Sequence, residues 1–109
     1  MEAMVVYRKD AQAKEVAPGV QRWVLAYNKD MMVVEMSFEA GCKMPAHSHP
    51  HTQSSCVKSG KFRFEAEGKP IEVTEGDTIN FPSGIEHCVT CLEAGRVLEI
   101  FSPMREDFL

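Results

Sequence analysis

The sequence predicts an all-β protein, a sandwich or barrel closed from antiparallel strands. Short apolar segments follow one another along the whole chain, with six prolines and seven glycines scattered between them as turn residues. The clearest segment is residues 61–67, where apolar and charged residues alternate strictly, as they do on the two faces of a strand. Helical periodicity is weak almost everywhere, so strands are favoured over helices.

Nine strands are expected in chain order, with one short helical turn within residues 8–17 and another in the tail, residues 104–109. The second strand contains an unbroken apolar run of five residues, Trp23–Tyr27, a length matched only by residues 3–7. The expected ranges are 4–8, 21–27, 31–39, 53–58, 61–67, 70–74, 78–81, 86–92 and 95–101.

Turn residues mark the boundaries of the later strands. Gly68-Lys69-Pro70 predicts a hairpin turn after the alternating strand at 61–67. Gly76-Asp77 and Pro82-Ser83-Gly84 are turn residues that frame the strand at 78–81. This segment is followed closely by His87.

Length and charge exclude several classes of protein. The 109 residues allow one ordinary domain, which we expect to span residues 1–109. The net charge of -4 argues against a nucleic-acid binder, which needs a basic face. No apolar run approaches the roughly 20 residues that cross a bilayer, so we expect no membrane span. The N-terminus does not resemble a signal peptide, so we expect a cytoplasmic protein with free thiols at Cys42, Cys56, Cys88 and Cys91.

Three of the four histidines lie within five residues, at His47, His49 and His51. Because side chains alternate along a strand, we expect His47 and His49 on one face, about 7 Å apart, where two imidazoles can bind one metal. Gln53, at the start of the next strand, and His87 are the candidates for further ligands. Three histidines and one amide oxygen suit a borderline divalent ion. An H-x-H pattern alone is a weak signal, because a surface loop can carry histidines and bind no metal.

The spacing around these histidines resembles the two signature motifs of the cupin superfamily. The first motif, G-x5-H-x-H-x3-E-x6-G, corresponds within residues 41–60 to Gly41, His47, His49, Gln53 and Gly60. The second, G-x5-P-x-G-x2-H-x3-N, corresponds within residues 76–91 to Gly76, Pro82, Gly84, His87 and Cys91. The resemblance implies a double-stranded β-helix (jelly-roll) barrel and one divalent transition metal ion, Ni, Zn, Mn or Fe, held by His47, His49, Gln53 and His87.

Two positions depart from the motifs, Gln53 in place of Glu and Cys91 in place of Asn. A neutral Gln53 leaves the metal more positive and so a better partner for an anionic substrate. We expect Cys91 in the core or behind the ligands, and His51 at the rim of the site. A homodimer is expected from the family resemblance.

The C-terminal strand carries a carboxylate on an apolar face. Val97, Glu99 and Phe101 share one face, and an inward Glu99 is poised for proton transfer, because burial raises its pKa and a nearby metal lowers it. Arg105, beyond the strand, is expected to fold over the barrel mouth and bind a carboxylate at two points. The alternative is that Glu99 lies at a wet edge and that Arg105 pairs with a neighbouring acid, Glu106 or Asp107.

The tail and the histidine segment together resemble the KdgF type of cupin from pectin and alginate degradation. Such proteins convert 4,5-unsaturated uronic acids into open-chain 5-keto-4-deoxyuronates. The resemblance implies that Glu99 is the general acid/base, Phe101 packs on the sugar and Arg105 binds its carboxylate; the family acid is usually Asp, one methylene shorter than Glu99. Two other classes stay open: a metal-dependent cupin dioxygenase, for which Gln53 is unusual, and a cupin that binds a sugar acid without catalysis.

Overall fold

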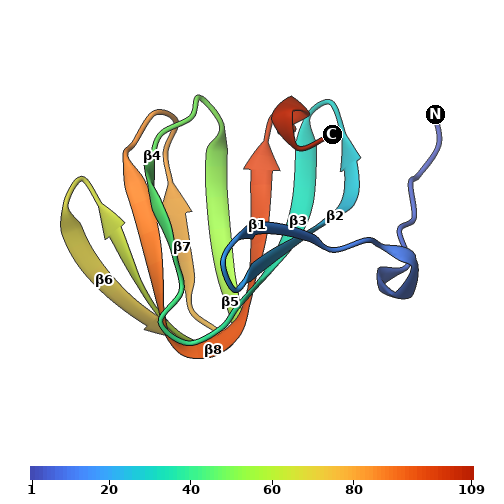
Figure 1. The fold of residues 1–109 in the computed structure, drawn as a ribbon. Helices are drawn as coiled ribbons and strands as arrows, with labels where there is room; N and C mark the ends of the chain where they lie inside the picture. Colours follow the sequence, from blue (N-terminus) through green and yellow to red (C-terminus); the bar gives the residue numbers. More distant parts are fainter.

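Two long strands, β5 (Thr52–Ala66) and β8 (His87–Ser102), form the spine of the fold in the computed structural model, which describes residues 1–109 (Figure 1). They pair antiparallel along almost their whole length, and both bend in the middle. A Cβ atom on Gly60 would lie 2.5 Å from the Glu93 carbonyl oxygen, and one on Gly95 would lie 2.0 Å from the Ser59 carbonyl oxygen. Glycine is therefore required where the backbones of β5 and β8 approach each other closely at the bend.

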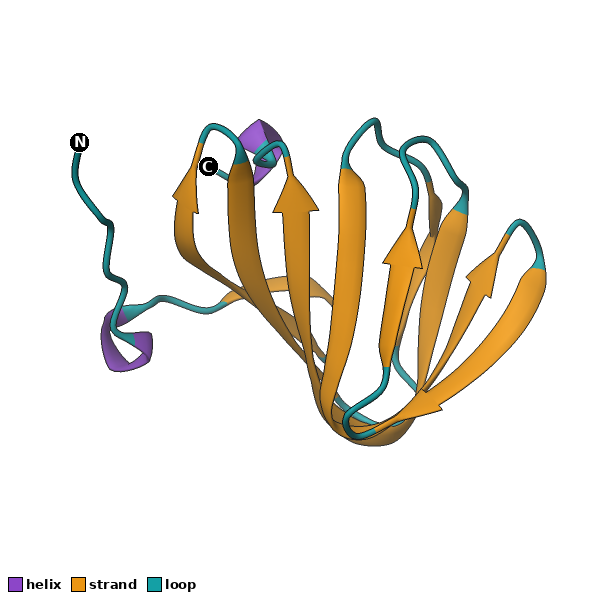
Figure 2. Ribbon diagram, turned by 180° about the vertical axis from the view of Figure 1, so that it is seen from behind, coloured by secondary structure: helices purple, strands orange, loops and turns teal.

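The bend divides the strands into two facing halves (Figures 1 and 2). The C-terminal part of β8 and the N-terminal part of β5 pair with β3 and β7 in one half, which β2 and β1 extend. The remaining parts of β8 and β5 pair with β4 and β6 in the other half. The shorter strands are β1 (Lys14–Ala17), β2 (Val20–Asn28), β3 (Met31–Phe38), β4 (Lys43–His47), β6 (Lys69–Thr74) and β7 (Thr78–Phe81).

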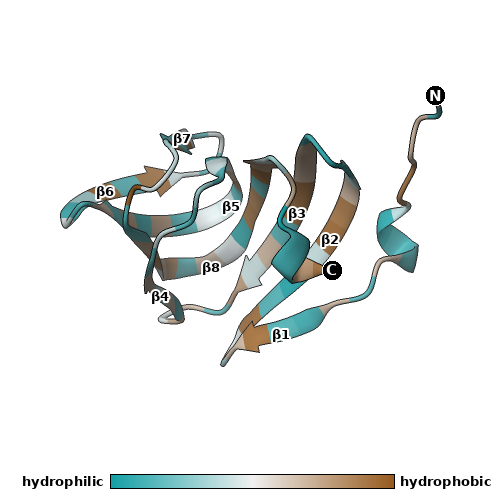
Figure 3. Cartoon of the chain, turned by 90° about the horizontal axis from the view of Figure 1, so that it is seen from above, coloured by the Kyte–Doolittle hydropathy of each residue, from teal (hydrophilic) through white to brown (hydrophobic).

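The core lies between the two halves, where alternate residues of each strand point inward, as the bands of hydropathy along β5 and β8 show (Figure 3). β3 shows the pattern clearly, because every second residue is buried from Met32 to Phe38. Phe38 packs edge-on against Phe62 of β5, with ring centroids 5.3 Å apart. The aromatic and aliphatic side chains of both halves therefore form one core.

The all-β prediction and the jelly-roll barrel are confirmed, and two pairs of expected strands are continuous. Residues 53–58 and 61–67 belong to β5, and residues 86–92 and 95–101 belong to β8. The alternation is interrupted at the bends, which is why each long strand reads in the sequence as two short ones.

The prediction for the N-terminus is wrong. Residues 4–8 form no strand, because no neighbouring strand pairs with this arm, which projects from the body of the molecule (Figure 1). Within residues 8–17, a short 3-10 turn, η1 (Arg8–Asp10), precedes β1. The expected turn in the tail is present as η2 (Glu106–Phe108).

The C-terminal tail is held at the open end of the barrel. The Ser102 hydroxyl donates to the Asp30 carbonyl (2.8 Å), and the Met104 amide donates to the Lys29 carbonyl (3.3 Å). These contacts place η2 beside the β2–β3 hairpin. All four cysteines are free thiols, as expected. None of the helical segments has the length and hydropathy needed to cross a membrane.

Candidate functional site

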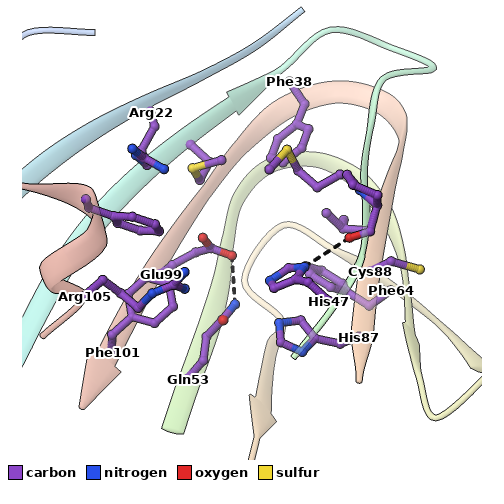
Figure 4. A pocket seen from close by; sticks show the side chains of 15 residues that line it. Arg22, Phe38, His47, Gln53, Phe64, His87, Cys88, Glu99, Phe101 and Arg105 are labelled. Atoms are coloured by element: carbon purple, nitrogen blue, oxygen red, sulfur yellow. Dashed lines mark hydrogen bonds between the residues drawn. The ribbon is translucent and has the colours of Figure 1, made fainter. Parts of the chain in front are cut away.

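A cavity of about 340 Å³ lies inside the barrel, lined by side chains of β2, β3, β4, β5, β8 and the tail (Figure 4). His47, His49 and His87 gather at one side, which we call the histidine end. Arg22 and Arg105 lie at the other side with the ring of Phe108, and we call this the arginine end. Glu99 points into the space between the two ends (Figure 4).

The three histidines converge although they do not share one strand. His47 is the last residue of β4 and His87 is the first of β8, whereas His49 lies in the loop after β4. The expectation that His47 and His49 alternate along one strand is therefore wrong, because β4 ends before His49. Their ring centroids are nevertheless 5.5 Å apart, and one possible ligand atom from each of the three rings lies within 4.8 Å of the others.

A backbone carbonyl orients each of these rings. In all three, Nδ1 contacts a carbonyl oxygen only two residues away: Pro45 for His47 (3.0 Å), His51 for His49 (3.1 Å) and Ile85 for His87 (3.0 Å). A carbonyl can only accept, so in neutral His47 and His87, whose only hydrogen bond is this one, Nδ1 carries the proton and Nε2 keeps a lone pair. This is the arrangement that metal-binding histidines use.

Burial keeps the inner rings neutral. It lowers the pKa of His87 to about 4, and it also lowers the pKa of His49, with a further lowering from Arg105. The Nε2 atom of His87 is buried and has no hydrogen-bond partner. A buried lone pair without a donor is costly unless a cation binds it.

Gln53 faces this cluster through its carbonyl oxygen. Its amide nitrogen donates to Glu99 Oε2 (2.9 Å) and to the Ser55 hydroxyl (3.0 Å), which turns Oε1 toward His49 Nε2 at 2.9 Å. His49 thus faces an oxygen acceptor with each of its ring nitrogens, and a neutral ring can donate to only one of them. A cation bound between Nε2 and the Gln53 oxygen would satisfy both atoms. The side chains of the histidine end and Gln53 therefore fit a divalent metal ion.

Glu99 is inward, as expected from its place between Val97 and Phe101. Burial raises the pKa of its carboxyl to about 7, opposed by the hydrogen bond from Ser55 and by the charges of Arg105 and Arg22. Such a carboxyl can both accept and release a proton near neutral pH. The alternative interpretation, an exposed carboxylate at a wet edge, does not match its position in the cavity.

Arg105 lies over the cavity, as expected, and it also pairs with a neighbouring acid, as the alternative had it. It lines the cavity with its guanidinium carbon 5.0 Å from the centre of the Phe101 ring. It also pairs with Asp107, since Nε donates to Oδ1 (3.0 Å) and Nη2 donates to Oδ2 (2.9 Å). Asp107 thus holds Arg105 in place over the mouth while the rest of the guanidinium remains free.

Three residues near the site were not found by sequence reasoning: Arg22, Ser55 and Phe108. Arg22 lies on β2 at the same parity as the inward Val20, so a charged residue at an inward position is the signal that marks it. Ser55, by the same argument, is a polar residue at a buried position of β5. Nothing in the pattern marks Phe108, because its place depends on how the tail docks.

Two further candidates lie outside the cavity lining. His51 Nε2 donates to the Met104 carbonyl (3.1 Å), so this ring holds the tail. It packs edge-on against His49, with ring centroids 5.4 Å apart, but it is not part of the cluster of His47, His49 and His87. Cys91 is buried, and its thiol donates to the Glu93 carbonyl (3.1 Å). It belongs to the core, one of the two positions expected for it.

Comparisons with known proteins agree with this geometry. Residues 34–101 match the cupin domain family. The pectin degradation protein KdgF of Dickeya dadantii (strain 3937) is 34% identical over 98 residues, which cover 88% of this chain and 89% of that protein. The structure of KdgF from Halomonas sp. superimposes with a TM-score of 0.92 at 31% identity, covering 97% of this chain and 100% of the other. An RmlC-like cupin from Shewanella frigidimarina NCIMB 400 gives a TM-score of 0.93 at 29% identity, covering 99% and 97%. The chain is therefore a cupin, of the branch that includes the pectin degradation protein KdgF.

Proposed function

We propose that this protein converts 4,5-unsaturated uronic acid monomers into linear 5-keto-4-deoxyuronates in pectin or alginate catabolism, as a metal-dependent ring-opening isomerase or lyase-type enzyme. The observation that carries the proposal is the position of Glu99. Its carboxyl lies between a histidine cluster that fits a divalent metal and an arginine end that suits a carboxylate. The similarity to KdgF supports the same substrate class.

We propose His47, His49, Gln53 and His87 as the metal ligands. Three neutral imidazoles and an amide oxygen accept Ni, Zn, Mn or Fe. A divalent ion bound there acts as a Lewis acid and stabilises negative charge on substrate oxygens. The neutral Gln53 leaves the full charge of the ion available to an anionic sugar.

The reaction is an isomerisation in which one proton changes place. The substrate is a cyclic hemiacetal, and its ring oxygen O5 belongs to an enol ether across C4 and C5. Glu99 takes the proton of the anomeric hydroxyl, a C1 carbonyl forms, and the C1–O5 bond breaks. The electron pair of that bond stays on O5, which gives an enolate. As the C5 ketone forms, the electrons of the C4=C5 bond take the proton that Glu99 returns to C4. With a pKa near 7, Glu99 suits both halves of this transfer.

Arg105 and Phe101 position the sugar. We propose that Arg105 binds the C6 carboxylate with the part of its guanidinium that Asp107 leaves free. The Phe101 ring, buried at the wall of the cavity, packs against the sugar and keeps water from the reacting atoms.

The proposal is tested by the ultraviolet absorbance of the C4=C5 bond of the unsaturated monomer. Metal-loaded protein is expected to speed the loss of absorbance well beyond the spontaneous rate in buffer. An unchanged decay contradicts the proposed reaction. Binding without turnover would then indicate a sugar-acid-binding cupin, and oxygen consumption would indicate a dioxygenase.

We further propose a cytoplasmic homodimer. Four free thiols suit a reducing compartment. The N-terminal arm exposes apolar side chains, with Met4, Val5 and Tyr7 49%, 67% and 63% exposed, and a second copy would cover them. Sedimentation equilibrium tests the dimer, which requires twice the 12.2 kDa mass of the chain.

A further inference from the structure

Arg22 is a cation of the cavity wall that has no partner. It projects from the middle of β2 toward Glu99 and Arg105 (Figure 4), and its guanidinium carbon lies 3.7 Å from the centre of the Phe108 ring. None of the N–H groups of its guanidinium forms a hydrogen bond or an ion pair within the chain. Arg105, on the same ring at 4.2 Å, is paired with Asp107.

A second pair of arginines in the same molecule shows what a complete cluster looks like. Arg8 and Arg96 lie over the Trp23 ring, with their guanidinium carbons 4.0 and 5.5 Å from its centre. Glu35 accepts a hydrogen bond from each of them, from Arg8 Nε at 3.1 Å and from Arg96 Nη1. One carboxylate therefore neutralises and joins two guanidiniums that share an aromatic ring.

The arginine end likewise has two guanidiniums, of Arg22 and Arg105, on one aromatic ring. Its carboxylate, however, forms hydrogen bonds to only one of them. Asp107 binds Arg105 and makes no hydrogen bond to Arg22. Burial lowers the pKa of Arg22 and the charge of Arg105 lowers it further, and the charges of Asp107 and Glu99 only partly oppose this, so the two guanidiniums repel one another. Glu99 lies near enough for its charge to act on Arg22, but it forms no hydrogen bond or ion pair with it; its Oε2 atom accepts from Gln53 and Ser55.

We propose that Arg22 is a second carboxylate-binding residue, and that the carboxylate of the ligand bridges Arg22 and Arg105 as Glu35 bridges Arg8 and Arg96. This inference rests on the proposed function and deepens it, because it assigns the discrimination between uronic acids and neutral sugars to a residue outside the tail. Guanidinium–carboxylate pairs are strong because they combine charge with two-point geometry. An anion held between two guanidiniums also relieves their mutual repulsion.

The binding test compares D-galacturonate with D-galactose, which has a hydroxymethyl group in place of the carboxylate, by calorimetry on metal-loaded protein. The wild type is expected to prefer galacturonate, and Arg22→Met is expected to reduce that preference by about 10- to 100-fold. Arg22→Met keeps apolar packing on Phe108, and Arg22→Lys is expected to restore part of the preference because it restores the charge. Arg63→Met is the matched control. Arg63 lies opposite Glu72 in the β5–β6 register and does not line the cavity.

A kinetic test separates this inference from the proposed function. For the unsaturated monomer, Arg22→Met is expected to raise KM about 10-fold or more, with a smaller change in kcat. Unchanged KM and unchanged galacturonate preference in Arg22→Met overturn the inference and leave the reaction intact. Loss of preference in a protein that opens no rings supports Arg22 while the proposed reaction fails. A wild type that binds both sugars equally overturns the role of Arg22.

Discussion

The two ends of the cavity are built in different ways. At the histidine end, each ring is oriented by a carbonyl two residues away, so Pro45, His51 and Ile85 place His47, His49 and His87 through local contacts. At the arginine end, Arg22 comes from β2 while Arg105 and Phe108 come from the tail, and an aromatic ring brings the two cations together.

This difference indicates which properties each end controls. The histidine end is built from short segments at the end of β4 and the start of β8 and from Gln53 of β5, so none of its side chains comes from the tail. The arginine end exists only when the tail is held by Lys29 and His51. Changes at the first end are therefore expected to alter metal content, and changes at the second are expected to alter substrate binding.

The largest effect is expected from His47→Ala. His47 is exposed, so the fold should tolerate the change, but metal affinity should fall about 100-fold or more and activity should fall to background. Elemental analysis of the purified variant measures the metal directly. In the wild type, chelation is expected to lower Tm by about 10 °C, because metal binding at 100 times Kd contributes about 2.7 kcal/mol.

His51→Ala is the matched control for His47→Ala. His51 belongs to the same segment, but its ring bonds the Met104 carbonyl. Its replacement should leave metal content unchanged and should raise KM, because the tail is released. If His51→Ala lost its metal while His47→Ala kept it, the division between the two ends would be wrong.

Glu99→Gln is expected to have the next largest effect. The side chain lies between the two ends, and its amide can still accept from Gln53 but cannot take up a proton. We expect kcat to fall about 10²- to 10⁴-fold with little change in KM or metal content. Glu72→Gln, on an exposed pair with Lys61, is the control and should behave as wild type. A loss of less than tenfold in Glu99→Gln would assign the proton transfer to another group.

Asp107→Asn is expected to have a modest effect at the arginine end alone. It removes the two-point ion pair that orients Arg105. Because Asp107 is 59% exposed, we expect only a two- to fivefold rise in KM, about what an exposed ion pair contributes. Steady-state kinetics measure the change, with Glu106→Gln as the control. A change in metal content would contradict the separation of the ends.

The smallest effect is expected from Glu35→Gln on the outer face. Burial acts to raise the pKa of Glu35, but hydrogen bonds from Arg8 and Arg96 outweigh it, and the pKa lies below its ordinary value of 4.5. Its stabilisation is therefore present above about pH 4.5 and lost as pH falls through the lower folded-state pKa. At neutral pH the free energy of unfolding of Glu35→Gln should be about 1 kcal/mol lower than that of the wild type, and its activity should be unchanged.

Denaturant unfolding at neutral pH and at low pH tests this change. The difference between wild type and Glu35→Gln should shrink as Glu35 of the wild type becomes protonated. A difference that stays constant with pH would mean that charge does not hold the cluster together. A loss of activity in this variant would contradict its use as a comparison for the arginine end.

The histidine end could be predicted from the sequence to the level of individual residues. His47, Gln53 and His87 lie at intervals set by turns and strand ends, and the same local backbone orients the rings. A carboxylate between Val97 and Phe101 marked Glu99 because it breaks an apolar face, but the pattern left an exposed position open, and only the family resemblance favoured the inward one. Arg22 breaks the inward face of β2 in the same way, but its neighbour Phe108 is far away in the chain, so no local pattern linked the two.

The sequence by itself determined that the chain is rich in strands, through apolar alternation and turn glycines and prolines, and it marked the histidines that gather at one end of the cavity. These features depend on backbone geometry over a few residues, which local side chains control. Only the tertiary structure decided that residues 4–8 form no strand, that β5 and β8 continue through their bends, and that Arg22 and Arg105 meet over Phe108. Each of these depends on a partner distant in the chain, because a strand needs a neighbour and a cation cluster needs a fold to hold it together.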